Sequence, residues 1–334
     1  MGILHSGLLS RIPGTQLIAI SESNPTIRHL GSKILPRVEF YESAEEMKRY
    51  GELDAIFITT PIGTHAKIVS QLTKDRVPVG LFVEKPLAAK AVDAELIARS
   101  ASAAGCIGMT GFQKRFQPQY RQVKYLIDTG AIGDVNSFTG YSRISSVFKK
   151  LEGWRFTHGQ GGALLDLGPH LIDLLSWYLG PLKLLDAEAT RLYSTEVEDQ
   201  VHARLEGRGK STGKIEISWS TPGYRVAETR IEIEGSGGSI IVSDDVLVLN
   251  IVKNTTSAVE PRQYVYQKPV LSTGVGFLLG EPEYYEEDLA FVNSVRQNVS
   301  TSPSLVEGVE VSRLISQIHE VTAQNTSNGG LEHD

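Results

Sequence analysis

The chain has 334 residues, which is long enough for two domains, each with its own hydrophobic core. Its net charge of −6 argues against nucleic acid and anionic membrane surfaces as main partners. No run approaches the roughly 20 apolar residues of a membrane helix, and residues 1–14 contain no apolar core of signal-peptide length. The lone Cys106 has no partner for an internal disulfide, so we expect a cytoplasmic protein.

The first third of the chain alternates helical patterns with short apolar runs, beginning with an expected helix over Ile3–Ile12. Buried parallel strands are predicted at Gln16–Ser21, Asp54–Thr60, Val79–Val83 and Ile107–Gly111. Crossover helices are predicted at Ser43–Arg49, Thr64–Lys74 and Ala88–Ala104. This alternation predicts an α/β domain over residues 1–115, built on a doubly wound parallel sheet.

The pattern changes after Arg115, where a helix is predicted over Pro118–Thr129. Runs of period two then predict strands at Val135–Ser145, Leu184–Leu192, Gln200–Leu205, Lys214–Ser220, Glu228–Glu234, Ile240–Val242 and Leu247–Val252. Consecutive strands without helices between them predict a mostly antiparallel sheet and therefore an α+β domain over residues 116–324. Two helices are expected at Glu283–Asn298 and Leu305–Gln324, before a polar, mobile tail over residues 325–334.

A lysine and a proline follow the predicted parallel strand Val79–Val83, in the run FVEKPLA over Phe82–Ala88. The carboxyl end of a parallel strand delivers its residues to a binding crevice. A lysine there can take up or release a proton during a reaction. The alternative is that Glu84-Lys85-Pro86 forms only a surface turn.

A second run, GGALLDLGPH over Gly161–His170, places an Asp and a His four positions apart. In a continuous helix Asp166 and His170 lie on one side, but Pro169 is tolerated only in the first helical turn. Gly168 could therefore cap a helix that begins at Pro169; in either case both side chains can face one cleft. The pair lacks a third ligand with comparable support, so we expect no metal site.

Together these two runs resemble the glucose–fructose oxidoreductase/inositol dehydrogenase family of nicotinamide-dependent sugar oxidoreductases, from about Gly2 to Glu320. The resemblance implies a Rossmann-type first domain, a cis peptide before Pro86 and catalytic roles for Lys85, Asp166 and His170. His170 or Lys85 would act as acid/base, while Asp166 would orient the substrate or the histidine. It also implies cofactor contacts from Gly2, Glu22, Thr59, Thr60, Pro61, His65, Glu84, Lys85, Pro86, Gln113 and Arg155, with Arg115 and Trp154 as weaker substrate candidates.

Glu22 follows Gly2 by 20 residues, at the end of the first predicted strand. In dinucleotide-binding folds an acid at this place accepts a hydrogen bond from the ribose and repels a 2′-phosphate. We therefore expect NAD rather than NADP as cofactor. The alternative is that Glu22 is a solvated loop carboxylate.

The resemblance breaks at the N-terminus, where Gly2 matches only the third glycine of the G-x-G-x-x-G fingerprint. The first strand and the two glycines that approach the phosphates are not in the sequence, and that strand belongs at the middle of the sheet. A strand from a partner could fill the gap. A start codon upstream of Met1 is the simpler explanation, and from it we expect weak cofactor binding by the 334-residue form.

The sequence thus predicts an NAD-dependent oxidoreductase that acts on a secondary hydroxyl of a sugar, cyclitol or related polyol. Substrate would lie between the crevice of the parallel sheet and the second domain. Transient oxidation that enables glycoside cleavage is another enzymatic use of the same family. The alternative from another class is a non-catalytic binding or regulatory relative that lost its cofactor. The resemblance also implies a homo-oligomer that assembles through the outer face of the second domain's sheet.

Overall fold

The computed structural model describes residues 1–48, 53–74, 78–150, 153, 156–157, 159–251, 262–265 and 282–329, with the side chains of 262–265 and 326–329 excepted. These residues divide into two compact units. The first unit contains Met1–Ala88, Val92–Gly111 and the described residues of Pro269–Val309. The second contains Ala89–Ala91 and the described residues of Phe112–Lys268 and Glu310–Asp334.

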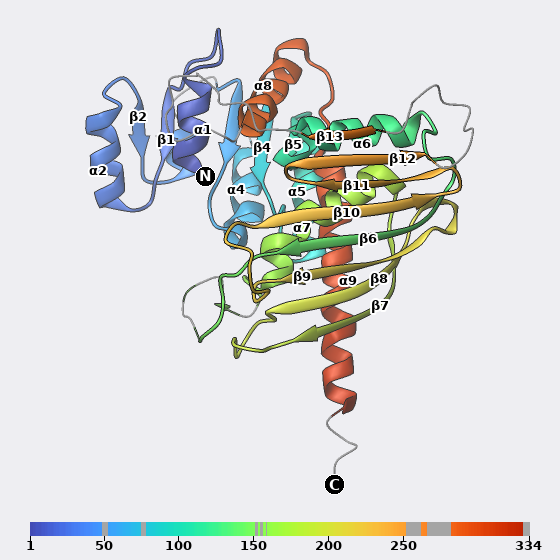
Figure 1. Cartoon of the computed structure of the whole chain (residues 1–334). Coiled ribbons are helices and arrows are strands. Elements are labelled where there is room, and N and C mark those ends of the chain that lie inside the picture. The colour runs from blue at the N-terminus through green and yellow to red at the C-terminus, as the bar shows by residue number, and fades with distance from the viewer. Residues whose placement is uncertain are drawn as a thin grey trace. The chain divides into compact units, whose positions relative to one another are not determined.

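The first unit follows the predicted alternation of helices and parallel strands (Figure 1). Its helices are α1 (Gly2–Leu9), α2 (Pro25–Ile34), α3 (Ala44–Met47), α4 (His65–Leu72), α5 (Ala91–Ala103) and α8 (Pro282–Gln297), with a 3₁₀ turn η2 (Ile62–Thr64). Its strands are β1 (Ala19–Ser21), β2 (Glu39–Tyr41), β3 (Ala55–Ile58), β4 (Gly80–Glu84) and β5 (Ile107–Gly111). β5 has the predicted bounds, because its apolar run is delimited by a helix on one side and a turn on the other.

The parallel strands of the first unit form two sheets rather than one continuous sheet. β1 pairs with β2, and β3, β4 and β5 pair in that order; all of these pairings are parallel. In the common dinucleotide-binding order the first strand lies between these two groups. Within the described residues no strand pairs between β1 and β3. The sheet therefore divides at the position where the sequence lacks the expected first strand.

The core of the first unit lies between its strands and crossover helices. Leu81, Phe82 and Val83 on β4 are fully buried, as expected for the middle strand of a parallel sheet that is covered on both faces. Val69 and Leu72 from α4 and Ile97 from α5 belong to the same core. This packing holds the carboxyl end of β4, where Glu84 and Lys85 follow, in a fixed position.

The second unit is built on an eight-stranded, mostly antiparallel sheet. Its order is β13-β12-β11-β10-β6-β9-β8-β7, and only β6 and β9 pair in parallel. The strands are β6 (Val135–Arg143), β7 (Lys183–Thr190), β8 (Gln200–Glu206), β9 (Thr212–Ser218), β10 (Glu228–Gly235), β11 (Gly238–Ser243), β12 (Val246–Ile251) and β13 (Arg262–Val265). The helices and 3₁₀ turns are η3 (Gln113–Phe116), α6 (Pro118–Asp128), α7 (Ala163–Leu179), η5 (Arg208–Lys210) and the larger part of α9 (Leu305–Gly329).

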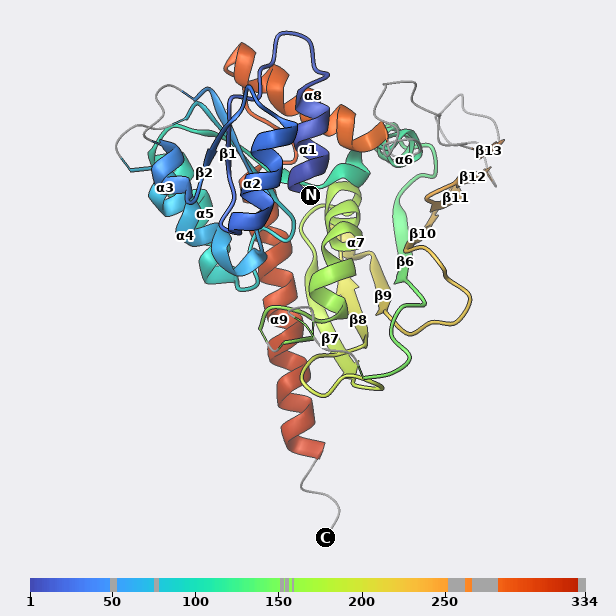
Figure 2. The same cartoon turned by 90° about the vertical axis from the view of Figure 1, so that its left-hand side faces the viewer.

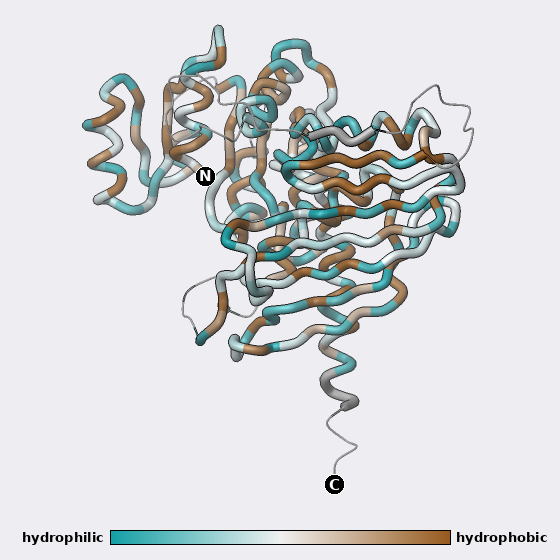
Figure 3. The backbone as a smooth tube through the Cα atoms, viewed as in Figure 1, coloured by the Kyte–Doolittle hydropathy of each residue, from teal (hydrophilic) through white to brown (hydrophobic). Residues whose placement is uncertain are grey.

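One face of this sheet is covered by α7, which packs on β6, β9 and β8 (Figure 2). Buried and more exposed residues alternate along β8, β10 and β11, and the same alternation of hydropathy is visible along the strands in Figure 3. Gly140 on β6 lies beneath Leu171, so close that an added Cβ would lie 2.9 Å from the leucine Cδ1. This close approach brings the helix, and with it Asp166 and His170, down onto the sheet.

Several elements differ from the sequence-based prediction. α2, β2 and β13 were not predicted, because β2 and β13 are short and α2 buries none of its residues. The predicted domain boundaries are wrong for α8, which packs against α1 and β5 and so belongs to the first unit. The predicted tail is wrong for residues 325–329: α9 continues to Gly329, and the amide of Asn325 donates to the carbonyl of Ala187 on β7. No described helix combines the length and the hydropathy that crossing a bilayer requires.

Candidate active site

The carboxyl end of β4 presents the first group of predicted site residues. The peptide between Lys85 and Pro86 is cis, as predicted. Lys85 is half-buried, whereas Glu84 is 6% exposed. One oxygen of Glu84 accepts the backbone N–H of Lys85 at 2.9 Å, and the other lies 2.9 Å from Nε2 of His5. Both carboxylate oxygens thus bind the protein itself, which favours a positioning role for Glu84 over direct cofactor contact.

The turn after β3 contains Thr59, Thr60 and Pro61, with Thr60 and Pro61 exposed. His65 at the start of α4 is buried and lies against two backbone carbonyls. Its Nε2 is 2.8 Å from the oxygen of Thr60, and its Nδ1 is 3.1 Å from the oxygen of Leu87. His65 therefore ties the turn after β3 to the turn after β4. This contact supports an indirect role, in which His65 fixes the backbone that carries the neighbouring candidates.

Gly2 brings the start of α1 close to the end of β3. A Cβ at Gly2 would lie 3.2 Å from Oγ1 of Thr59, a distance at which the threonine would have to shift. No side chain among the described residues caps the N-terminus of α1. Backbone N–H groups at a helix start are suited to bind a phosphate. The residues present therefore fit one part of a dinucleotide site, namely the helix end and the glycine that allows close helix–strand packing.

Glu22 lies at the carboxyl end of β1, where a ribose-binding acid is expected. Its Oε1 accepts the backbone N–H of Asn24 at 2.8 Å. Nearby, Arg28 donates to the carbonyl of Glu22 at 2.6 Å and to the carboxylate of Glu42 at 3.3 Å. Glu22 is thus the acid expected for NAD, and Arg28 beside it is an arginine of the kind that can hold a 2′-phosphate. Arg28 is paired with the carboxylate of Glu42.

Asp166 and His170 both lie on α7, which is continuous through Pro169. Of the two sequence-based alternatives, the continuous helix is therefore correct, and the spacing places both residues on one side of α7. A proline at this position removes one helical hydrogen bond. The helix persists because most of its residues are buried.

The indole N–H of Trp219 donates to Oδ2 of Asp166 at 2.9 Å. Trp219 is fully buried just beyond β9, and its ring lies 5.4 Å from that of Phe156. This hydrogen bond fixes the carboxylate of Asp166, while His170, at 8% exposed, lies one turn further along. Trp219 was not among the predicted site residues, because nothing in the sequence relates a tryptophan after β9 to an acid on α7.

The start of α7 depends on Gly162 and Glu198. Gly162 has φ +112°, a conformation that side chains rarely adopt, and an added Cβ would lie 2.2 Å from a carboxylate oxygen of Glu198. The same carboxylate accepts the backbone N–H of Leu164 at 3.0 Å. A negative charge at a helix N-terminus is stabilising. The Gly-rich run before Asp166 is therefore needed for the helix to begin next to Glu198.

Two of the remaining predicted residues lie on η3, and two lie outside the described residues. Gln113 is 9% exposed. Arg115 is 4% exposed and donates to both oxygens of Asp173 on α7, at 2.8 and 2.6 Å. This buried ion pair favours a structural role for Arg115 over substrate contact. Trp154 and Arg155 belong to the residues that the structure does not describe.

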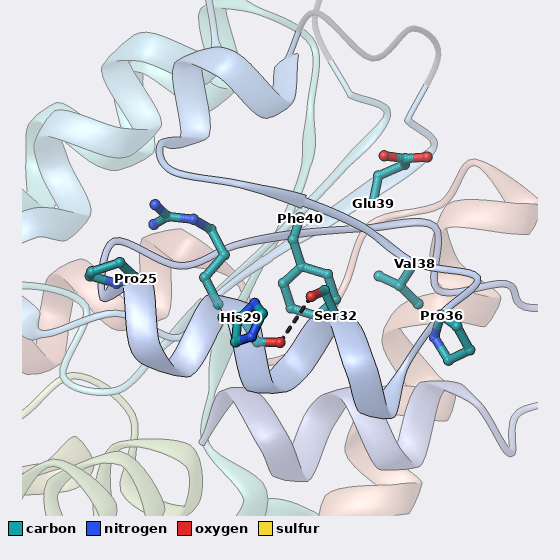
Figure 4. Close-up of a pocket in the computed structure, with 8 residues that line it drawn as sticks. Pro25, His29, Ser32, Pro36, Val38, Glu39 and Phe40 are labelled. Atoms are coloured by element: carbon teal, nitrogen blue, oxygen red, sulfur yellow. Dashed lines mark hydrogen bonds between the residues drawn. The ribbon is translucent and has the colours of Figure 1, made fainter.

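A shallow pocket of about 480 Å³ lies between α2 and β2 (Figure 4). The figure shows His29 and Ser32 on α2, with the Ser32 hydroxyl donating to the carbonyl of His29. None of the predicted site residues lines this pocket, so we do not place the reaction there. The described residues also contain no group of three or more His, Cys, Asp or Glu side chains arranged to hold a metal ion.

Two family models match the chain and together cover most of it. Residues 5–112 match an oxidoreductase family described as having an NAD-binding Rossmann fold, and residues 120–241 match the GFO/IDH/MocA C-terminal domain. The chain belongs to the GFO/IDH/MocA oxidoreductase family. The predicted resemblance, the Rossmann-type first domain and the mostly antiparallel second domain are therefore confirmed.

Individual relatives are similar over much of the chain. The scyllo-inositol 2-dehydrogenase (NAD(+)) of Bacillus subtilis is 25% identical over 255 residues, which are 72% of this chain and 70% of that protein. The myo-inositol 2-dehydrogenase of Thermotoga maritima is also 25% identical, over 92% of this chain and 88% of that protein. A levoglucosan dehydrogenase solved with NADH and levoglucosan shares the fold, with a TM-score of 0.84, 21% identity and coverage of 97% and 95%.

Proposed function

We propose that the protein is an NAD-dependent dehydrogenase that acts on a secondary hydroxyl of a sugar, a cyclitol or a related polyol. The observation that carries the proposal is the position of Lys85, half-buried at the carboxyl end of the middle strand of a parallel sheet. Its peptide N–H is held by the buried carboxylate of Glu84. Membership of an NAD-binding oxidoreductase family supports the cofactor, and the inositol dehydrogenases among the relatives support the class of substrate.

The chemistry requires one proton acceptor and one hydride acceptor. When bound, NAD⁺ supplies the hydride acceptor for the carbon that carries the hydroxyl. Lys85 or His170, in its neutral form, takes the hydroxyl proton, so that the alcohol becomes a carbonyl compound. Asp166, held by the indole of Trp219, orients the substrate or His170. The N-terminus of α1 and Glu22 bind the pyrophosphate and the adenosine ribose.

The test is to measure NADH formation at 340 nm with NAD⁺ and a panel of inositols, aldoses and sugar alcohols, together with a fluorescence titration of NADH. Turnover of at least one polyol supports the proposal. NADH binding without turnover of any polyol would contradict the substrate class. Failure to bind either cofactor would contradict the proposed cofactor site.

We expect NADH to bind at least tenfold more tightly than NADPH, because a carboxylate at Glu22 repels a 2′-phosphate and loses its ribose hydrogen bond. The substitution Glu22→Gln removes the charge and should bring the ratio of the NADPH and NADH dissociation constants closer to one. Glu45→Gln, an exposed acid on α3, is the matched control and should leave the ratio unchanged. Equal or tighter binding of NADPH by the unaltered protein would mean that Arg28, and not Glu22, governs the choice.

We propose a cytoplasmic location, supported by the single cysteine, whose thiol pKa is raised by burial to about 11 and which is therefore poorly reactive.

We also propose a homo-oligomer that assembles through the sheet face not covered by α7. Light scattering of the purified protein reports its mass, and a monomer at micromolar concentration would contradict this assembly.

A further inference from the structure

A histidine outside the predicted site is buried in the first unit and contacts two acids. His5 on α1 is 1% exposed. Its Nδ1 lies 2.8 Å from Oδ1 of Asp288 on α8, and its Nε2 lies 2.9 Å from Oε1 of Glu84 at the end of β4. These partners are 283 and 79 residues away in the chain. His5 thus joins three elements, of which α1 and α8 lie side by side in Figures 1 and 2.

Both contacts of the ring are with carboxylates, which only accept hydrogen bonds when they are ionised. When both carboxylates are ionised, the ring must donate from both nitrogens, and a histidine does so only in its protonated form. The two carboxylates raise the pKa of His5 to about 9, against the opposing effect of burial. Burial raises the pKa of Asp288, and the positive ring of His5 opposes that rise. At neutral pH the ring is therefore a cation between two acids.

Aromatic rings surround this cation. The centroid of the His5 ring lies 5.1 Å from that of Phe82, 5.5 Å from Phe57 and 6.2 Å from Tyr284. An apolar surrounding strengthens charge-assisted hydrogen bonds and makes an unpaired polar group costly. The ring contacts Glu84 from β4 and Asp288 and Tyr284 from α8. The same helix α8 also buries Glu283 and Glu287.

The hydrogen bonds continue from His5 to the backbone of Lys85. The oxygen of Glu84 that does not face His5 accepts the peptide N–H of Lys85 at 2.9 Å. One line of contacts therefore runs from α8 through α1 to the end of β4. It consists of Asp288, His5, Glu84 and the peptide of Lys85. A change in the ring of His5 reaches the backbone of Lys85 through a single carboxylate.

We propose that His5 is a positioning residue for Lys85: the ring, held by Asp288, fixes the rotamer of Glu84, and Glu84 fixes the peptide that carries Lys85. This inference rests on the proposed function of Lys85. It also links α1, whose N-terminus faces the proposed cofactor site, to the proposed proton acceptor. His5 does not touch substrate and takes no proton from it.

Two amides imitate the two ring nitrogens separately and so provide a matched pair of variants. In His5→Gln the side-chain NH₂ can reach the position of Nε2 and keep the contact with Glu84. In His5→Asn it can reach only the position of Nδ1, which faces Asp288. Both variants lose the charge and should be less stable to a similar degree. A merely structural role would therefore affect the two variants alike.

The first measurement needs neither cofactor nor substrate. Amide hydrogen exchange of Lys85, followed by NMR, should be about tenfold faster in His5→Asn than in the unaltered protein, and close to unaltered in His5→Gln. The ¹⁵N shifts of the His5 ring should show both nitrogens protonated at pH 7.5. Equal exchange at Lys85 in all three proteins, or a neutral ring, would overturn the proposal.

The second measurement is turnover of a polyol that the unaltered protein oxidises. We expect kcat to fall at least tenfold in His5→Asn and to stay within about threefold in His5→Gln, with KM for NAD changing little in either variant. Equal losses in both variants would overturn the proposal. If the unaltered protein oxidises no polyol, the proposed function fails, and the exchange measurement still decides whether His5 orders Lys85. If His5→Asn does not fold, two measurements still test the proposal. They are the ¹⁵N shifts of the His5 ring in the unaltered protein and the amide hydrogen exchange of Lys85 in His5→Gln.

Discussion

Replacing Lys85 or His170 by alanine should lower kcat by about 10²–10⁴ on a polyol that the unaltered protein oxidises, because each variant loses a proposed proton acceptor. Lys85 is half-buried, so Lys85→Ala removes little core volume and should leave the fold intact. His170 is 8% exposed, and its variant should unfold at a somewhat lower temperature. Steady-state kinetics give the loss, and circular dichroism confirms the fold.

The size of the two losses should also assign the roles. The variant that lacks the proton acceptor should show the larger loss of kcat. The pH profile of kcat for that variant should also lack the step that the titration of this residue produces. Lys90→Ala is the matched control, since Lys90 is an exposed lysine five positions beyond Lys85 and should leave kcat unchanged. Near-normal rates for both Lys85→Ala and His170→Ala would refute the proposed catalytic roles.

Breaking the buried ion pair between Arg115 and Asp173 should destabilise the second unit by about 3–5 kcal/mol. Both side chains are at most 4% exposed and the contact is bidentate. The guanidinium also lies 5.2 Å from the ring of Trp177. The substitution Asp173→Ala leaves a buried cation without its carboxylate, which is why the expected cost exceeds that of an ordinary lost contact.

Urea denaturation followed by tryptophan fluorescence measures this effect, since the two described tryptophans, Trp177 and Trp219, belong to the second unit. Asp186→Ala is the control: Asp186 forms an exposed pair with Arg204 at 3.7 Å, and its loss should cost less than about 1 kcal/mol. The double variant Arg115→Met/Asp173→Asn removes both charges and should be more stable than Asp173→Ala alone. Equal costs for Asp173→Ala and Asp186→Ala would contradict the argument.

The sequence by itself determined the order of the elements and the ends of those with a clear pattern. β5 was predicted with its observed bounds, and strands β6 to β12 of the second unit were predicted within a few residues, because burial of one or both faces requires a regular spacing of apolar residues. The two motifs for which we propose catalytic roles were also visible in the sequence, and their family resemblance implied the cis peptide before Pro86 that the structure contains.

Only the tertiary structure decided which residues hold these motifs in place. The apolar spacing of α1 gives no sign that His5 binds Glu84 and Asp288, since those contacts join residues 79 and 283 positions apart. The sequence likewise gives no sign of the hydrogen bond from Trp219 to Asp166, or that α8 belongs to the first unit. The continuity of α7 through Pro169 was also open, because local preference opposes it and burial of the helix outweighs that preference. Local patterns record the periodicity of burial, whereas contacts between distant segments depend on how the chain packs in three dimensions.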